Sequence, residues 1–89
     1  MEYRISHISD RNRFETEVDG YTAHVVYEIM DGSLNIAHTF VPRPIENRGI
    51  AAALVKAAYS FALEENLKSM ATCSYANMWL SRHPEYQKG

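Results

Sequence analysis

The segment from residue 41 to residue 54 carries residue types that suit phosphate binding at the start of a helix. Gly49 leaves the backbone without a side chain, and Asn47 tolerates the left-handed conformation that such a loop often needs. The first turn of a helix has unpaired backbone N–H groups and the positive end of the helix dipole. Cations that could supplement these amides are Arg43, Arg48 and Lys56. The pattern indicates an anion site; an ordinary strand-to-helix loop with solvated arginines is the alternative.

Two further residues could supply covalent or proton-transfer chemistry. Cys73 lies between a strand pattern and a helix pattern, where a helix dipole would lower the pKa of the thiol and make it nucleophilic. The alternative is a small, buried apolar cysteine. His38 stands near the end of a strand pattern, and strand alternation favours a buried structural histidine over a base. A metal site is not expected, because the histidines are scattered over positions 7, 24, 38 and 83.

Length and composition restrict the possible classes of protein. With 89 residues, the chain has room for one small domain, residues 1–89. Nine basic and eleven acidic residues give a net charge of −2, so no positive field attracts nucleic acid. A single cysteine forms no internal disulfide and fits a reducing, cytoplasmic setting. We expect no signal peptide and no membrane segment, because no apolar run approaches the roughly 18 residues that spanning a bilayer requires.

Three β-rich runs predict an antiparallel meander. Asp19-Gly20 and Asp31-Gly32 separate the runs, and an Asp-Gly pair readily takes the positive φ angles of tight hairpin turns. A short edge strand over residues 3–8 would extend the sheet. The three runs are Phe14–Val18, Tyr21–Met30 and Leu34–Val41.

A helical period replaces the strand pattern after the prolines at positions 42 and 44. Apolar residues at 50, 54, 57, 58 and 61 share one face of a helix from near Arg48 to about Glu65. Leu67–Cys73 predicts a short strand, parallel to the third meander strand through a right-handed crossover. Ser74 is the expected cap of a final helix that ends near Arg82. The order β-β-β-α-β-α predicts an α+β fold.

Residues 46–51 read Glu-Asn-Arg-Gly-Ile-Ala and resemble the R/Q-x-x-G-x-G/A signature of the GNAT superfamily of N-acetyltransferases. Gly49 and Ala51 match, whereas Glu46 replaces the Arg or Gln of that signature. The chain is more similar still to a small, one-domain GNAT-like branch, although Phe40 stands where that branch usually has Glu. The matching segments are Asp19-Gly20, His38-Thr39-Phe40-Val41-Pro42, Gly49-Ile50-Ala51, Cys73-Ser74-Tyr75 and Arg82-His83-Pro84-Glu85-Tyr86.

The resemblance implies a minimal GNAT-like fold that binds acetyl-CoA. In it, the pyrophosphate would lie on the amides of about Arg48 to Ala52, and the pantetheine arm would pair with the backbone of residues 39–41. The acetyl thioester would lie near Cys73. The residues that the resemblance and the loop chemistry assign to the cofactor are Thr39, Phe40, Val41, Arg43, Asn47, Arg48, Gly49, Ile50, Ala51 and Ala52.

For catalysis, the candidates are Cys73, His38 and Tyr75, with Glu46 as a weaker base. GNAT enzymes of full length carry helices between their first two strands, and the few residues from Ile8 to Phe14 leave no room for them. We therefore expect an open acceptor side, suited to a protein or polyamine, on a monomer or weak dimer.

Three functions follow as hypotheses. The first is an acetyl-CoA-dependent N-acetyltransferase of minimal size. The second is a non-catalytic acetyl-CoA-binding protein, or an acetyl carrier that uses Cys73. The third is a small α+β interaction domain that binds no nucleotide.

Overall fold

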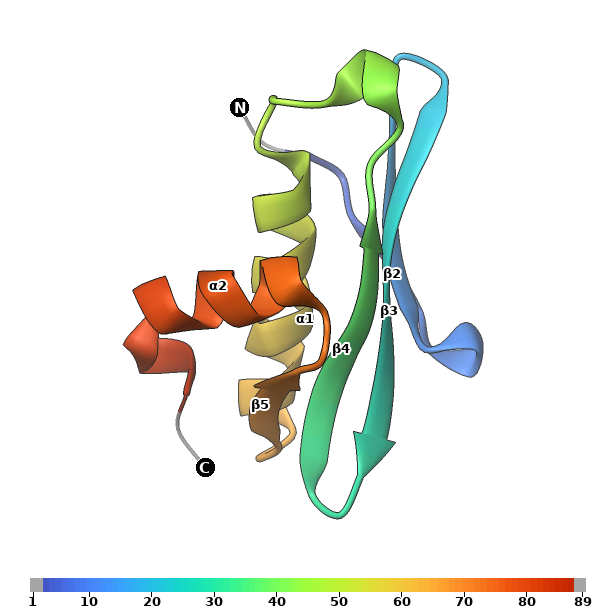
Figure 1. Cartoon of the computed structure of the whole chain (residues 1–89). Helices are drawn as coiled ribbons and strands as arrows, with labels where there is room; N and C mark the ends of the chain where they lie inside the picture. The colour runs from blue at the N-terminus through green and yellow to red at the C-terminus, as the bar shows by residue number, and fades with distance from the viewer. Residues whose placement is uncertain (1–2, 88–89) are drawn as a thin grey trace.

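A single sheet with two helices on one of its faces forms the fold (Figure 1). The computed structural model describes residues 3–87. Neighbouring strands follow chain order, and all pairs are antiparallel except β4 with β5. The predicted α+β class and element order are confirmed. The elements are β1 Ser6–Ile8, β2 Arg13–Val18, β3 Tyr21–Met30, β4 Ser33–Phe40, α1 Ile50–Glu64, β5 Lys68–Ala71 and α2 Ser74–Arg82, with 3-10 turns at Ser9–Arg11, Arg43–Ile45 and Pro84–Tyr86.

The two Asp-Gly pairs form the hairpin turns that the sequence predicts. Asp19 and Gly20 have φ angles of 52° and 81°, and Asp31 and Gly32 have 53° and 78°. Positive φ at both central residues matches the twist of the flanking strands, which is why these turns fix the register of the meander. The expected edge strand is also confirmed, because β1 pairs antiparallel with β2.

A β-bulge in β4 changes which side chains face the helices. Ile36 lies opposite Tyr27 and His38 lies opposite Val26, which leaves the residue between them without a partner. Beyond the bulge, Thr39 lies opposite the buried Val25 and therefore faces the helices. His38 is turned to the outer face of the sheet and is exposed. The preferred interpretation of His38 as a buried residue is therefore wrong, because one inserted residue reverses the strand alternation.

Helix α1 packs against β2, β3, β4 and β5, and α2 packs beside it against α1, β4 and β5. Its start at Ile50 comes later than predicted, because Asn47 and Gly49 have φ angles of 65° and 76° and cannot continue a right-handed helix. The buried face is wider than the predicted one, since Tyr59 also packs against Trp79 with ring centroids 6.0 Å apart. The buried residues of α1 are Ile50, Leu54, Val55, Ala58, Tyr59 and Ala62.

Strands β4 and β5 separate before β4 ends. Their parallel pairing runs from Ser33↔Lys68 to Ile36↔Ala71, whereas β4 continues to Phe40. The predicted parallel strand is confirmed. The capping prediction is wrong: Cys73, with an extended backbone, is the N-cap residue of α2, and Ser74 is already helical.

Only a one-turn 3-10 helix, Ser9–Arg11, joins β1 to β2, so no helix covers the outer face of the sheet from this connection. Within residues 3–87, neither helix combines the length and the hydrophobicity that crossing a membrane requires. Over the same residues, no three His, Cys, Asp or Glu side chains come together as metal ligands.

Candidate functional site

A hollow of about 260 Å³ lies at the start of α1, between the end of β4 and the start of α2. Six residues that the sequence assigned to a cofactor line it, together with Tyr75 from the catalytic candidates and Glu46. These six are Val41, Asn47, Gly49, Ile50, Ala51 and Ala52. Four other assigned residues, Thr39, Phe40, Arg43 and Arg48, do not line it.

Backbone donors face this hollow. The amides of Ile50, Ala51 and Ala52 would pair with carbonyls that precede the helix, and no backbone acceptor among the described residues takes them. The first hydrogen bond of α1 runs from the Ala53 amide to the Gly49 carbonyl at 3.1 Å. Three neighbouring N–H groups at the positive end of a helix dipole form an anion-binding surface.

Position 49 requires glycine because of its positive φ angle, and not because a side chain would clash with its neighbours. The N-cap of α1 has a φ of 76°, a region that costs other L-residues roughly 1–2 kcal/mol. A Cβ atom built on Gly49 would meet nothing within 4 Å. The loop therefore needs glycine for its shape, and the shape presents the three amides.

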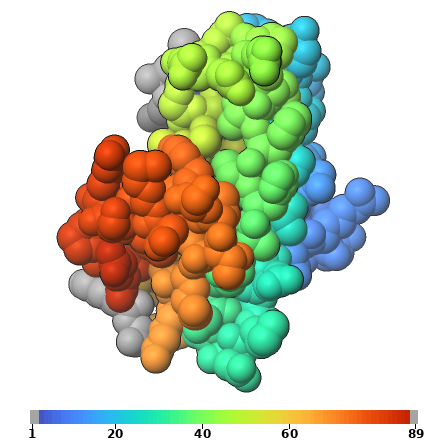
Figure 2. All heavy atoms as spheres, in the orientation of Figure 1, coloured from blue at the N-terminus to red at the C-terminus, as the bar shows by residue number. Residues whose placement is uncertain are grey.

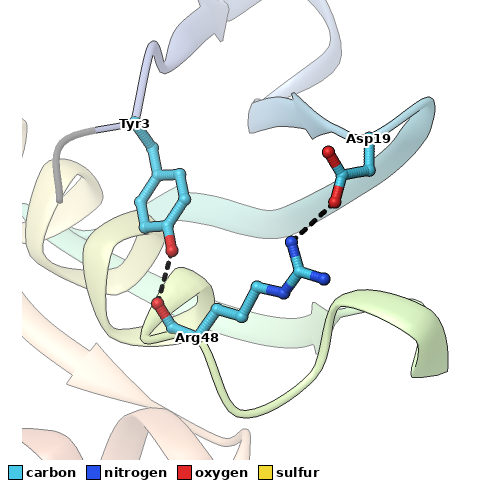
Figure 3. A network of polar contacts seen from close by, with 3 residues as sticks. All are labelled: Tyr3, Asp19 and Arg48. Carbon is cyan, nitrogen blue, oxygen red and sulfur yellow. Dashed lines mark hydrogen bonds and ion pairs between the residues drawn. The ribbon is translucent and has the colours of Figure 1, made fainter.

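Two contacts hold the loop before α1 in place (Figure 3). The hydroxyl of Tyr3 donates to the backbone carbonyl of Arg48. The guanidinium Nη1 of Arg48 lies 2.7 Å from a carboxylate oxygen of Asp19, in the turn between β2 and β3. The Arg48 side chain thus points to a hairpin turn 29 positions earlier and not into the hollow. No local pattern in the sequence reveals either contact.

The side chains that line the hollow do not attract an anion. The exposed Glu46 lines the hollow, whereas no cationic side chain does so among residues 3–87. Arg43 is exposed in the 3-10 turn Arg43–Ile45. Anion binding at this site would therefore depend on the backbone amides.

The thiol of Cys73 is held at the start of α2. Its Sγ lies 3.4 Å from Oγ1 of Thr39, which the bulge has turned inward. Burial raises the pKa of the thiol, but the Thr39 hydroxyl and the nearby backbone amides of Ala76, Tyr75 and Thr39 favour the thiolate and outweigh this effect. The net pKa of Cys73 is lowered, which favours the nucleophilic thiolate.

The end of β4 connects this thiol to the hollow. The amides of Thr72 and Cys73 both donate to the carbonyl of Ile36, at 3.2 and 3.1 Å, and there the pairing with β5 stops. Thr39 contacts Cys73, and Val41 lines the hollow. Residues 39–41 thus form a path from one feature to the other along an edge that β5 leaves unpaired.

The catalytic candidates fall into two groups. Tyr75 lines the hollow, and burial raises the pKa of its phenol, so it stays protonated at neutral pH. His38 lies on the outer face of the sheet, away from Thr39, with its ring 5.8 Å from that of His24. Burial, and then the charges of Arg13 and His38, lower the pKa of His24 against an opposing effect of Glu15. The structure brings Cys73 and Thr39 together, places Tyr75 at the hollow, and leaves His38 on the other face of the sheet.

Comparison with known proteins identifies the fold and the family. The sequence model of the family described as GCN5-related N-acetyl-transferase matches residues 13–89. The chain belongs to this family. Protein NATD1 of Xenopus tropicalis is 34% identical over 84 residues, covering 91% of this chain and 77% of the relative. Protein NATD1 of Mus musculus is also 34% identical over 84 residues, covering 91% and 76%.

A solved structure of the same family has the same arrangement of elements. It is the NMR solution structure of a GCN5-like protein from Staphylococcus aureus, 32% identical, with a TM-score of 0.75. The match covers 96% of this chain and 84% of that chain. The expected membership of a small GNAT-like family and the expected fold are therefore confirmed.

Proposed function

We propose that this protein is an acetyl-CoA-dependent N-acetyltransferase of minimal size. One observation supports the proposal most. The unpaired amides of Ile50, Ala51 and Ala52 lie at one end of the free edge of β4, and Cys73 lies beside the same edge. The pyrophosphate of CoA accepts hydrogen bonds from the three amides. The pantetheine arm, which carries amides of its own, pairs with residues 39–41. Its thioester then lies near Cys73.

In direct transfer, the nitrogen of a neutral amine attacks the thioester carbonyl. Backbone N–H groups near Phe40 and Val41 stabilise the oxyanion. When the intermediate collapses, the new C–N bond remains, the C–S bond breaks, and CoA leaves as a thiolate. Tyr75 is the candidate donor of the proton that CoA takes up, since its phenol is protonated. The proton released by the amine passes to solvent.

A second candidate function is an acetyl carrier, favoured by the lowered pKa of Cys73. The Cys73 thiolate would attack the thioester carbonyl, a new S–C bond would form, and CoA would leave as a thiolate that takes a proton from solvent. Cys73 would then hold the acetyl group as a thioester for a later acceptor.

The acceptor is proposed to be a primary amine on a protein or a polyamine. The outer face of the sheet has no covering helix from the connection between β1 and β2, and Phe40 is exposed on it. Phe40 also occupies the position where related small chains were expected to carry a glutamate, so no carboxylate base is assigned there.

Amide NMR spectra recorded during titration with acetyl-CoA and with CoA test the proposal. The largest shifts are expected at residues 50–52 and 39–41. If no amide in these segments shifts at millimolar ligand, both the transferase and the carrier functions are wrong. The hypothesis that then stands is a small interaction domain that binds no nucleotide.

Intact mass and CoA release separate transferase from carrier. An adduct of one acetyl group that Cys73→Ala abolishes supports the carrier. CoA release that rises with added polyamine and survives Cys73→Ala supports direct transfer.

A further inference from the structure

We propose that His24, on the outer face of the sheet, accepts the proton that the acceptor amine loses during acetyl transfer. The proposal rests on the proposed function, because it assigns one more group to the same reaction. Position 40 holds a phenylalanine and offers no base. No pattern in the sequence indicates His24, and only the strand pairing brings it opposite this position.

A row of side chains crosses the outer face and ends at the free edge of β4. Backbone pairing places Phe40 of β4 opposite His24 of β3, and His24 opposite Glu15 of β2. Paired residues of an antiparallel sheet lie on one face, with their Cβ atoms about 4.5–5.5 Å apart. The rings of His24 and Phe40 have centroids 5.6 Å apart. His24 is therefore one strand away from the segment proposed to pair with pantetheine.

The free edge of β4 is open toward both faces of the sheet. Figure 2 shows the green end of β4 at the surface, with the orange start of α2 on one side and the cyan and blue strands on the other. Cys73 lies on the side of the helices, through its contact with Thr39, whereas Phe40 is 46% exposed on the outer face. An amine can therefore approach a thioester held along residues 39–41 from the outer face, past Phe40 and His24.

The surroundings of His24 keep its imidazole neutral at neutral pH. The residue is half-buried, and burial is the largest cause of its lowered pKa. Arg13 on β2 and His38 on β4 lower the pKa of His24 further, and Glu15 on β2 opposes them. Glu17 lies on the same face of β2, two positions beyond Glu15. A neutral imidazole has one ring nitrogen free to accept a proton.

Neighbouring rings also hold His24 in place. Its ring lies between those of Phe40, at 5.6 Å, and His38, at 5.8 Å. His38 itself is exposed. A base acts only when it stays within hydrogen-bond reach of the proton that it removes, so the enclosed His24 suits this role better than His38.

The proposed proton transfer follows the attack of the neutral amine on the thioester carbonyl. The new C–N bond leaves a positive charge on the nitrogen, and the free ring nitrogen of His24 takes one proton from it. The C–S bond then breaks, and the CoA thiolate takes its proton from Tyr75. The His24 imidazolium releases its proton to solvent, and Tyr75 regains one from solvent, so both groups return to their starting states.

The pH dependence of CoA release, with spermidine as the acceptor, tests the assignment. Below the pKa of His24, both this residue and the amine must lose a proton, so the logarithm of kcat/KM should rise with a slope of about two. Above that pKa, only the amine must lose one, and the slope should be about one. We expect the bend below pH 6.5, because the pKa of His24 is lowered from that value. His24→Gln should slow CoA release about 100-fold and abolish the bend.

Two further variants assign the role to position 24. His38→Gln is the matched control, since it removes an imidazole from the same face. This variant should keep the bend and move it to higher pH, because the charge of His38 no longer lowers the pKa of His24. Phe40→Glu, made in the His24→Gln chain, should restore part of the rate, because a carboxylate would then stand opposite position 24.

The outcomes separate this proposal from the proposed function. A bend that survives His24→Gln would overturn the role of His24 and leave the transferase standing, as would a bend that only His38→Gln removes. If the unmodified chain releases no CoA in the presence of spermidine, both proposals are wrong. NMR titration of the His24 ring in the unmodified chain keeps the test valid if the variant does not fold. Its midpoint should coincide with the bend, and a different midpoint would overturn the assignment.

Discussion

The N-termini of α1 and α2 both carry the positive end of a helix dipole and free backbone N–H groups. They differ in what lies beside those N–H groups. At α1, Gly49 caps the helix without a side chain, and the amides that follow stay unpaired and face a hollow. At α2, Cys73 stands in the cap position without a side-chain capping hydrogen bond, and the nearby amides of Tyr75 and Ala76 help to lower the pKa of its thiol. The first terminus keeps its donors for a ligand, whereas the second uses them to lower the pKa of a thiol.

The difference comes from one side chain at the cap. Positive φ at Gly49 admits glycine at no steric cost, and glycine has no atom that could satisfy the following amides. The extended backbone of Cys73 admits any residue, and its thiol lies near enough to the first amides of α2 for them to lower its pKa. The same dipole therefore serves binding at one site and activation at the other.

The largest effect is expected from Gly49→Ala. An alanine at a φ of 76° is strained, so the free energy of unfolding should fall by roughly 1–2 kcal/mol. Affinity for CoA should fall about 10-fold or more, because relief of the strain moves the three amides. Calorimetry of unfolding and of binding measures both quantities.

The matched control is Gly20→Ala, at a φ of 81° in a hairpin turn with nothing within 4 Å of an added Cβ. It should lose similar stability and keep its affinity for CoA. Equal loss of affinity in the two variants would show that position 49 matters only for stability.

The second prediction concerns the thiol. Thr39→Val removes a hydrogen bond to the sulfur, so the pKa of Cys73 should rise and its alkylation by iodoacetamide at neutral pH should slow several-fold. Alkylation rates measured against pH give the pKa. An unchanged midpoint would mean that the backbone amides of Thr39, Tyr75 and Ala76 lower the pKa without the Thr39 hydroxyl.

The same shift predicts how stability depends on pH. The pKa of Cys73 is lower in the folded chain than the ordinary 9.0 of an unfolded one, so ionisation of the thiol stabilises the fold. This contribution is fully present above pH 9 and is lost as the pH falls through the folded pKa. Thr39→Val and Cys73→Ala should reduce it, which unfolding curves at neutral and alkaline pH would detect.

The sequence predicted those features that depend on near neighbours. Asp-Gly pairs set their own φ angles, and apolar periodicity located the meander strands and α1. The loop before α1 was predicted from Asn47 and Gly49, whose backbone preferences are local. These signals are contained in a few adjacent residues and need no knowledge of the rest of the chain.

Features that depend on distant residues were not predicted. The bulge that exposes His38 is set by register against β3, and a single inserted residue leaves no trace in the alternation before it. The pairing of Arg48 with Asp19 joins a loop to a turn across the fold. The packing of His83 and Tyr86 on Trp79 depends on how the chain reverses after α2.

The third prediction concerns charge at the α1 terminus. Glu46 lines the hollow, so Glu46→Gln should raise affinity for CoA several-fold at low salt and less at high salt. Glu64→Gln is the control, because this exposed carboxylate lies at the other end of α1. Equal effects of the two variants would indicate a change in net charge rather than a local contact.

The smallest effect is expected at the contact that holds the α1 loop. Arg48 and Asp19 are both exposed, so the pair should contribute no more than about 1 kcal/mol to unfolding. A double-mutant cycle with Arg48→Gln and Asp19→Asn measures their coupling in both unfolding and CoA binding. If the pair only positions the loop, each single variant weakens CoA binding modestly, and the double variant is no worse than either. If the Arg48 guanidinium instead binds phosphate directly, Asp19→Asn should strengthen CoA binding by releasing it, and Arg48→Gln should weaken it, so opposite signs would decide against a purely positional role.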